Sequence, residues 1–131
     1  MEQKNITTQT SRQILVVEDD EAVAALLNHL FTKENYEVKV LTDGLDAKKH
    51  VQPNTPKPDV LLLEMILPSV SGYDLLHHVR DTEGWEDVPV VVLSSVWREE
   101  EVERAIKLGA NDYITKPFHL NQLVTRVNQY I

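Results

Sequence analysis

Three short, unbroken apolar runs limit the fold of this chain more than any other feature of its sequence. The chain reads ILVV at residues 14–17, VLLL at residues 60–63 and PVVVL at residues 89–93. Apolar runs of this length, rich in β-branched residues, are typical of strands buried on both faces of a parallel sheet. We therefore predict a central parallel sheet with helices packed on each face.

Segments with helical spacing of apolar residues alternate with the predicted strands. We predict strands at residues 14–17, 36–41, 60–63, 89–93 and 112–115 and helices at residues 21–33, 44–51, 71–80, 97–108 and 119–131. Strands that alternate with helices form a parallel sheet joined by right-handed crossovers. The prediction is one doubly wound α/β domain with a five-stranded parallel sheet over residues 13–131, preceded by a polar, flexible tail at residues 1–12.

Charge and composition narrow the classes of partner. The chain has 21 acidic and 13 basic residues, a formal net charge of −8 and no cysteine. An acidic domain has little affinity for the phosphate backbone of nucleic acids, and the lack of cysteine agrees with a reducing compartment. No apolar run reaches the roughly 20 residues that span a bilayer. We expect a cytoplasmic protein that binds other proteins, with no direct contact to nucleic acid or membrane.

Polar residues follow four of the five predicted strands. They are Glu18, Asp19 and Asp20 after the first strand, Glu64 after the third, Ser94 and Ser95 after the fourth, and Lys116 after the fifth. Because the carboxyl ends of parallel strands lie at one edge of a sheet, these side chains should converge there. Carboxylates beside a lysine and a hydroxyl suit Mg²⁺ and a phosphoryl group. Each residue taken singly also has an ordinary interpretation as a helix cap, a loop hydroxyl or a surface lysine.

Four segments in order resemble the receiver domain of response regulators. They read ILVVEDDEAV, PDVLLLEMILPSVSGYDLL, VPVVVLSS and GANDYITKPF, and the resemblance covers residues 13–131. Four ordered motifs are far more specific than one. The resemblance implies a flavodoxin-like sheet with strand order 2-1-3-4-5 and a non-enzymatic signalling role in a two-component or phosphorelay system. It also implies Mg²⁺ as a cofactor, with a histidine kinase or phosphotransfer protein and a downstream effector as partners.

The resemblance further implies which residues hold the metal ion. Asp19 matches a direct Mg²⁺ ligand, and Glu18 matches the acid that acts through water. Glu64 and the backbone carbonyl of Ile66 complete the implied metal site. Asp20 lies one residue beyond the acidic pair, and we expect it to cap the following helix.

A second group of residues matches the phosphate-sensing part of a receiver. Ser94 matches the switch hydroxyl that hydrogen-bonds a phosphoryl oxygen, and Lys116 matches the lysine that pairs with that oxygen. Tyr113 matches the aromatic residue that turns inward on activation. The resemblance also implies a cis peptide bond before Pro117.

The chain departs from the family at Glu64, which stands where the family has its phosphoacceptor aspartate. The extra methylene moves the carboxylate by about 1.5 Å, and a misplacement of about 1 Å can cost on the order of a hundredfold in rate. We predict that Glu64 is not efficiently phosphorylated, reaches toward Lys116 and Ser94, and acts by partial phosphomimicry or constitutive docking. The alternatives are an inert site, a receiver phosphorylated by a histidine kinase at Glu64 or Ser94, and a laboratory replacement of aspartate.

An enzyme of similar topology is a third class of function. A Mg²⁺-dependent phosphohydrolase would carry a second aspartate two residues after its strand-end nucleophile. Here Glu64 is followed by Met65 and Ile66. We therefore expect no catalytic residue in this chain.

The segment from Trp97 to Ile131 matches the partner face of receivers, and a homodimer through it is one expectation. Within it, Asp112 and Arg126 match an acid and an arginine that pair across the dimer in winged-helix transcription factors of the family. Val102 and Gln122 stand where a second such pair would be, which argues against that dimer.

Trp97, beside Ser94, has three interpretations. It either covers the mouth of the pocket, serves as a docking anchor, or packs partly into the core.

Overall fold

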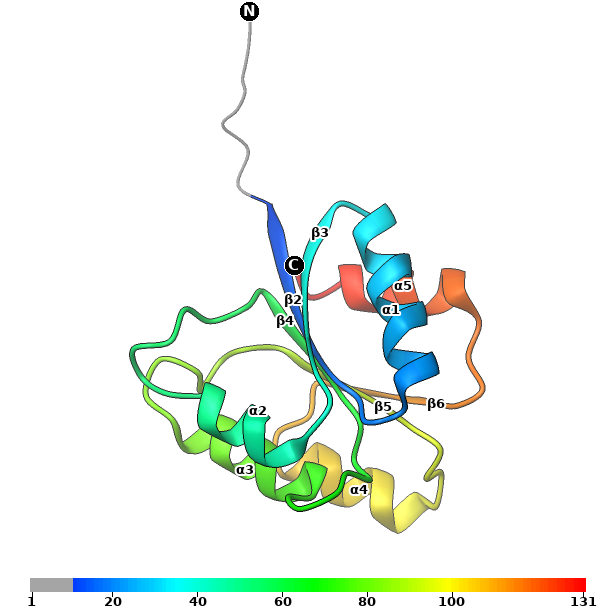
Figure 1. Ribbon diagram of the computed structural model, residues 1–131. Helices are drawn as coiled ribbons and strands as arrows, with labels where there is room; N and C mark the ends of the chain where they lie inside the picture. Colours follow the sequence, from blue (N-terminus) through cyan, green and yellow to red (C-terminus); the bar gives the residue numbers. More distant parts are fainter. Residues whose placement is uncertain (1–10) are drawn as a thin grey trace, which may run out of the picture.

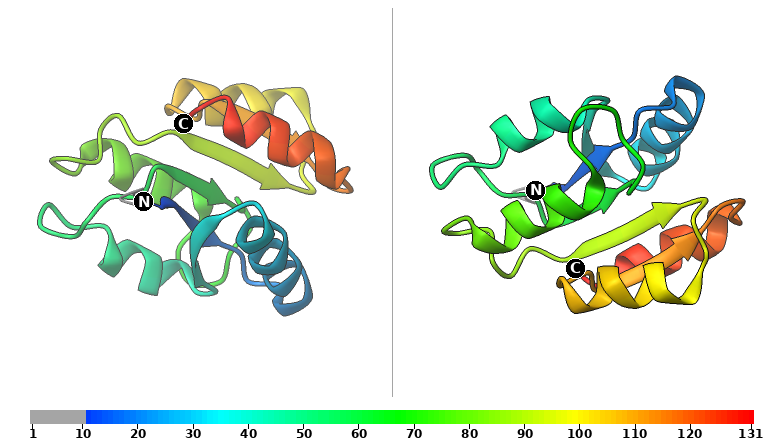
Figure 2. Two further views of the ribbon diagram at one scale, coloured as in Figure 1. Left: turned by 90° about the horizontal axis from the view of Figure 1, so that it is seen from above. Right: turned by 90° about the horizontal axis from the view of Figure 1, so that it is seen from below.

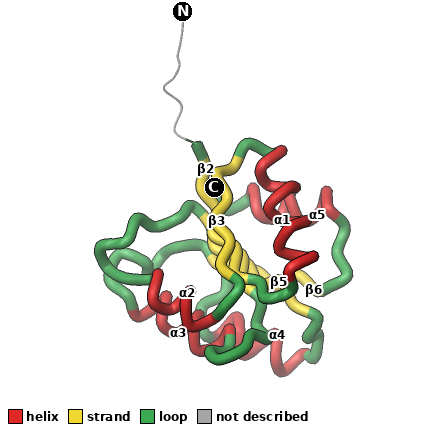
Figure 3. The backbone as a smooth tube through the Cα atoms, viewed as in Figure 1, coloured by secondary structure: helices red, strands yellow, loops and turns green. Residues whose placement is uncertain are grey.

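The computed structural model describes residues 11–131, which form a parallel sheet between two layers of helices (Figures 1 and 3). The strands are β2 (Arg12–Val17), β3 (Tyr36–Leu41), β4 (Val60–Leu63), β5 (Val90–Ser94) and β6 (Asp112–Thr115), and the helices are α1 (Glu21–Lys33), α2 (Gly44–His50), α3 (Gly72–Asp81), α4 (Glu99–Lys107) and α5 (Leu120–Asn128). The strand order is β3-β2-β4-β5-β6, and all four neighbouring pairs are parallel. Counted along the chain this is 2-1-3-4-5, so the predicted fold is confirmed.

The unbroken apolar runs supply a core on each side of the sheet. In β4, Leu61 and Leu63 pack with buried residues of α2, α3 and α4, whereas Val60 and Leu62 pack with buried residues of α1 and α5. Successive side chains of a strand point to opposite faces, so a strand covered on both sides needs apolar residues at every position. Figure 2 shows the two helical layers on either side of the sheet.

Two predicted helix boundaries agree with the structure. Asp20 is the N-cap of α1, and its Oδ1 accepts hydrogen bonds from the amides of Ala22 at 2.9 Å and Val23 at 3.1 Å. Gly109 follows α4 with a φ of 114°, a left-handed conformation that favours glycine at a helix end. The expectation that Asp20 caps the helix after the acidic pair is therefore confirmed.

Two other helix boundaries differ from the prediction. The fourth helix begins at Glu99 rather than Trp97, because the Val96 carbonyl accepts a hydrogen bond from Tyr113 and the chain stays extended through Arg98. The last helix ends at Asn128 rather than Ile131, because the amides of Gln129, Tyr130 and Ile131 bond the carbonyls three residues back instead of four, so the final turn is tighter than an α-helix.

The described part of the chain begins inside the predicted N-terminal tail. Residues 1–10 of the predicted tail lie outside the described residues. Arg12, at the end of that tail, belongs to β2, where its guanidinium lies 4.4 Å from the centroid of the Tyr36 ring. Within residues 11–131, no helix is long and apolar enough to cross a membrane.

Candidate functional site

Four of the residues expected at the site come together at the carboxyl ends of the strands. Glu18 follows β2, Glu64 follows β4, Ser94 ends β5 and Lys116 follows β6. Backbone hydrogen bonds extend the strand register past the strand ends: the Glu64 amide donates to the Val17 carbonyl at 3.0 Å, and the Lys116 amide donates to the Ser94 carbonyl at 2.9 Å. The sheet itself therefore holds these residues close to one another.

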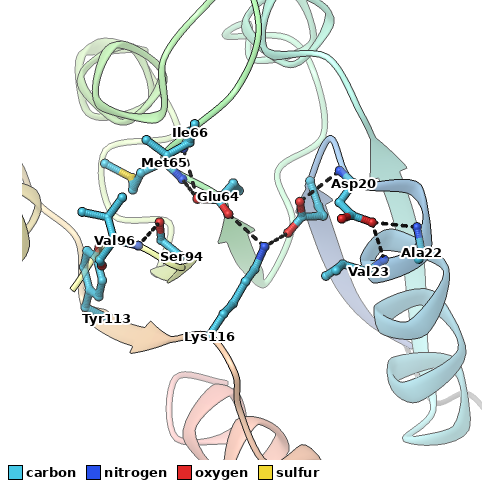
Figure 4. A network of polar contacts seen from close by, with 11 residues as sticks. Asp20, Ala22, Val23, Glu64, Met65, Ile66, Ser94, Val96, Tyr113 and Lys116 are labelled. Atoms are coloured by element: carbon cyan, nitrogen blue, oxygen red, sulfur yellow. Dashed lines mark hydrogen bonds and ion pairs between the residues drawn. The ribbon is translucent and has the colours of Figure 1, made fainter.

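Lys116 bridges the two buried glutamates. Its Nζ lies 2.7 Å from Glu18 Oε1 and 2.9 Å from Glu64 Oε1, and Figure 4 shows the lysine side chain reaching up to Glu64 from the end of its strand. The Glu18 and Glu64 side chains are 3% and 5% exposed. One ammonium group thus compensates two carboxylates in a site that water barely reaches.

The Glu64 carboxylate is also held by its own loop. Its Oε2 accepts hydrogen bonds from the amides of Met65 at 2.6 Å and Ile66 at 3.0 Å. Glu18 is held in a similar way, because its Oε2 accepts from the Asp20 amide at 3.1 Å. Every oxygen of the two carboxylates therefore has at least one donor, and hydrogen bonds to ionised groups are stronger than neutral ones.

The pKa values of the bridged pair follow from burial and proximity. Burial raises the pKa of the Glu18 carboxyl above its ordinary value, and the hydrogen bond from Lys116 offsets only part of this effect. Burial lowers the pKa of the Lys116 ammonium, but its hydrogen bonds to Glu18 and Glu64 outweigh burial and leave the pKa raised. The lysine is therefore protonated throughout the physiological pH range.

Ser94 and Tyr113 meet at the backbone of Val96. Ser94 is fully buried, and its Oγ accepts a hydrogen bond from the Val96 amide at 3.2 Å. The Tyr113 hydroxyl donates to the Val96 carbonyl at 2.6 Å, and its ring packs against the core beneath α2, α3 and α4. Among the hydrogen bonds of residues 11–131, none joins Ser94 to Glu64, so Glu64 reaches Lys116 but makes no such contact with the serine.

Whether the oxygen donors of the site fit a metal ion depends on the partners that they already have. Carboxylates are the ligands that Mg²⁺ prefers, but both buried carboxylates are paired with Lys116, while Asp19 is exposed to solvent. Ile66 contributes its amide to Glu64. Within the described residues, no group of three or more His, Cys, Asp or Glu is placed to hold a metal ion. With Lys116 in this position the arrangement does not fit a bound metal ion, and Mg²⁺ binding, which would require the lysine to move away from the carboxylates, stays a prediction.

Three further features of the sequence can now be placed. The Lys116–Pro117 peptide bond is cis, as the resemblance implied. Arg126 and Asp112 form an ion pair within the chain, with Arg126 Nε 3.0 Å from Asp112 Oδ2 and a second contact between Nη2 and Oδ1. Trp97 is 74% exposed, so its interpretation as a partly buried core residue is wrong.

A contact that was not predicted from the sequence joins α3 to α4. The Tyr73 hydroxyl donates to Glu101 Oε2 at 2.6 Å and lies 3.3 Å from the Glu101 carbonyl oxygen. The Arg104 guanidinium lies 4.0 Å from the centroid of the Tyr73 ring. Burial, followed by the contact with Glu101, raises the pKa of the Tyr73 hydroxyl. No local pattern signals this contact, because its partners meet only when the two helices pack.

Comparisons with known proteins agree with this geometry. A model of the response regulator receiver domain matches residues 14–128. The phosphate regulon transcriptional regulatory protein PhoB of Rhizobium meliloti is 36% identical over 115 residues, which are 88% of this chain and 50% of PhoB. The chain spans about half the length of the curated relatives that it matches.

Two solved structures show the same fold with a metal ion. The receiver domain of the sensor histidine kinase PA1611 from Pseudomonas aeruginosa, which has a magnesium ion coordinated in its active site cleft, is 25% identical with a TM-score of 0.83 over 92% of this chain and 98% of that chain. The Mn(2+)-bound response regulator Rcp1 is 30% identical with a TM-score of 0.77 over 90% of each chain. The family match, the strand order and the residues gathered at the strand ends together show that this chain belongs to the response regulator receiver domain family of two-component signalling.

Proposed function

We propose that residues 13–131 form a receiver that signals by docking to other proteins without being phosphorylated. In this proposal Glu64 stands at the phosphoacceptor position and imitates part of the phosphorylated state. The observation that carries the proposal is the set of contacts of the Glu64 carboxylate, which binds the Lys116 ammonium through one oxygen and the amides of Met65 and Ile66 through the other.

These contacts argue against phosphorylation of Glu64. Phosphoryl transfer needs a carboxylate oxygen aligned with the phosphorus of the donor, and positioning supplies most of the catalysis. The Glu64 side chain is only 5% exposed, and three donors already bind its two oxygens. An attacking oxygen would have to leave these donors and reach solvent before it met a phosphodonor.

The same contacts support partial phosphomimicry. A phosphoryl group carries about −1.5 to −2 charges and three acceptor oxygens, whereas a carboxylate has one charge and two oxygens. Glu64 engages Lys116 but not Ser94, so it replaces only part of such a group. The position of Tyr113, half-buried and bonded to the Val96 carbonyl, supports an inward-turned aromatic residue.

The proposal extends to partners and surroundings. With a net charge of −8, the domain is suited to protein partners rather than to nucleic acid. We place it in the cytoplasm, with a histidine kinase or phosphotransfer protein and a downstream effector as its partner classes. Because Lys116 already supplies the positive charge between Glu18 and Glu64, docking in this form requires neither Mg²⁺ nor catalysis.

A phosphodonor experiment tests the proposal. The wild type, Glu64→Asp and Glu64→Asn are incubated with acetyl phosphate and Mg²⁺, and the intact mass of each protein is measured. We expect the added mass of one phosphate on Glu64→Asp and none on the wild type or on Glu64→Asn, which is the matched control without a carboxylate. Phosphate mapped to Glu64 of the wild type would overturn the proposal, and phosphate mapped to Ser94 would favour a hydroxyl acceptor.

A further inference from the structure

Two exposed apolar side chains form a surface beside the site. Trp97 is 74% exposed and Ile66 is 58% exposed, the two highest values among the exposed large hydrophobic residues of the described chain. Both line a shallow groove of about 490 Å³, whose lining residues are Ile66, Ser95, Val96, Trp97, Arg98 and Glu101. Large apolar side chains exposed side by side are costly in water and mark binding surfaces. We call this surface the Ile66–Trp97 groove.

The walls of the groove are hydrogen-bonded to the residues of the site. On one wall the Ile66 amide donates to Glu64, and on the other the Val96 amide donates to Ser94. The Tyr113 hydroxyl donates a hydrogen bond to the Val96 carbonyl. Figure 4 shows Ile66 beside Glu64 and Val96 beside Ser94 and Tyr113. The shape of the groove therefore depends directly on the contacts of Glu64, Ser94 and Tyr113.

The charges around the groove select the kind of partner. Glu99 and Glu100 are exposed in the first turn of α4, which begins two residues after Trp97, while Glu103 on the following turn lies with Glu100, Arg104 and Lys107 on a neighbouring surface. Glu101, held by the Tyr73 hydroxyl, lines the groove itself. The lining therefore holds one acid, Glu101, and one base, Arg98. The acidic excess at this end of α4 comes from the exposed glutamates of its first turn, and the whole chain likewise carries a net charge of −8.

We propose that the Ile66–Trp97 groove docks a short segment of a partner protein in which a bulky apolar side chain is flanked by lysines or arginines. The apolar side chain packs between Trp97 and Ile66, and the flanking bases face the glutamates of α4. A second copy of this chain is a poorer occupant, because it carries the same net charge of −8 and would bring like charges together. The inference rests on the proposed docking function and names its partner class.

Fluorine NMR of protein labelled with fluorotryptophan provides a direct readout. The chain has two tryptophans, of which Trp85 is 1% exposed and Trp97 is 74% exposed. The spectrum should contain one resonance from the core and one from the groove, assigned with Trp97→Phe. The probe is a synthetic peptide with two central leucines flanked on each side by three lysines. Controls are the same peptide with serines for the leucines and one with glutamates for the lysines.

The inference predicts a specific pattern of binding. The leucine–lysine peptide should shift the Trp97 resonance and leave that of Trp85 unchanged, while both control peptides bind much more weakly. Trp97→Ala should weaken binding at least about tenfold, because a central aromatic residue dominates such an interface. Glu99→Gln with Glu100→Gln should weaken it about threefold, as expected for exposed ion pairs. Leu26→Ala, at an exposed apolar residue of α1 outside the groove, should have no effect.

Four results would overturn the inference. The first is that the serine peptide binds as tightly as the leucine–lysine peptide, and the second is that Trp97→Ala binds the leucine–lysine peptide as tightly as the wild type does. The third is that the Trp97 resonance does not shift at millimolar peptide. The fourth is that the Trp97 resonance shifts when the protein alone is concentrated, which would indicate self-association instead. The proposed function fails separately. If the wild type is phosphorylated on Glu64 and the peptide still binds at Trp97, the inference about the groove is supported, whereas the proposal of docking without phosphorylation is refuted.

Discussion

Replacing Lys116 with methionine tests whether this ammonium group is the main counter-charge of the site. Methionine keeps an apolar side chain that fills much of the space of the lysine stem, but it removes the charge that lies 2.7 Å from Glu18 and 2.9 Å from Glu64. Two carboxylates that are 3% and 5% exposed are then left close together without a positive partner. The variant should therefore be much less stable at neutral pH.

The expected loss can be estimated from the geometry. Removing one partner of a buried ion pair costs about 3–5 kcal/mol. The Lys116 side chain is 18% exposed, and both carboxylates keep backbone donors from Asp20, Met65 and Ile66, so the lower end of that range, about 3 kcal/mol, applies. With a slope of about 2 kcal/mol per molar urea, the unfolding midpoint should fall by about 1.5 M.

The dependence of this loss on pH is the decisive measurement. Burial already raises the folded-state pKa of the Glu18 carboxyl, and removing the lysine, which lowers that pKa, raises it further above the unfolded value. A carboxyl group with a raised pKa destabilises the fold as pH increases through the window above the ordinary glutamate value of about 4.3, so the loss should be small near pH 4.5 and full near pH 7.5. Urea unfolding at both pH values measures it.

Two control variants separate this explanation from a general effect of the substitution. Lys107→Met changes an exposed lysine of α4 and should cost less than about 0.5 kcal/mol. Adding Glu18→Gln to Lys116→Met removes one of the two carboxylates and should recover more than half of the loss. A loss that is the same at both pH values, or that Glu18→Gln fails to reduce, would refute the reasoning.

Three further predictions concern packing, an ion pair and the metal ion. Gly72→Ala should cost about 2–3 kcal/mol in urea unfolding, because a Cβ at this position would lie 2.4 Å from the Met65 Cα; a loss under about 0.5 kcal/mol would contradict this packing. Burial raises the pKa of Asp112, but the hydrogen bonds from Arg126 and the Tyr113 amide, together with the charge of Arg126, outweigh burial and hold the pKa below its ordinary value. The stability that Asp112 contributes is therefore present above about pH 4 and lost as pH falls through the folded-state pKa. Asp112→Asn should cost about 1 kcal/mol at neutral pH and almost nothing once the pH is below that folded-state pKa; a cost independent of pH would contradict the ion pair. Mg²⁺ should raise the Tm of Lys116→Met more than that of the wild type, because the dication can then replace the ammonium as counter-charge; equal shifts would show that the lysine does not compete with the metal.

Much of the fold could be predicted from the sequence because local pattern and burial agree along this chain. The run at Val60–Leu63 had to be a strand with a core on each side, since no other element of four residues uses an apolar side chain at every position. Asp20 before a helical pattern, and Gly109 after one, marked helix ends through contacts within a few residues. The convergence of Glu64 and Lys116 followed from the parallel topology, which places strand ends at one edge.

The tertiary structure alone decided how the side chains at that edge pair. Glu18 and Lys116 are 98 residues apart in the chain, and no periodicity shows that one lysine bridges both glutamates while Ser94 bonds the Val96 amide instead. The outward position of Trp97 was equally hidden, because it depends on Tyr113 holding the Val96 carbonyl. The sequence by itself determined which groups reach the end of the sheet, since local pattern marks where each strand ends and a parallel sheet places those ends at one edge. Their partners depend on distances between elements, which exist only once the sheet and helices have packed.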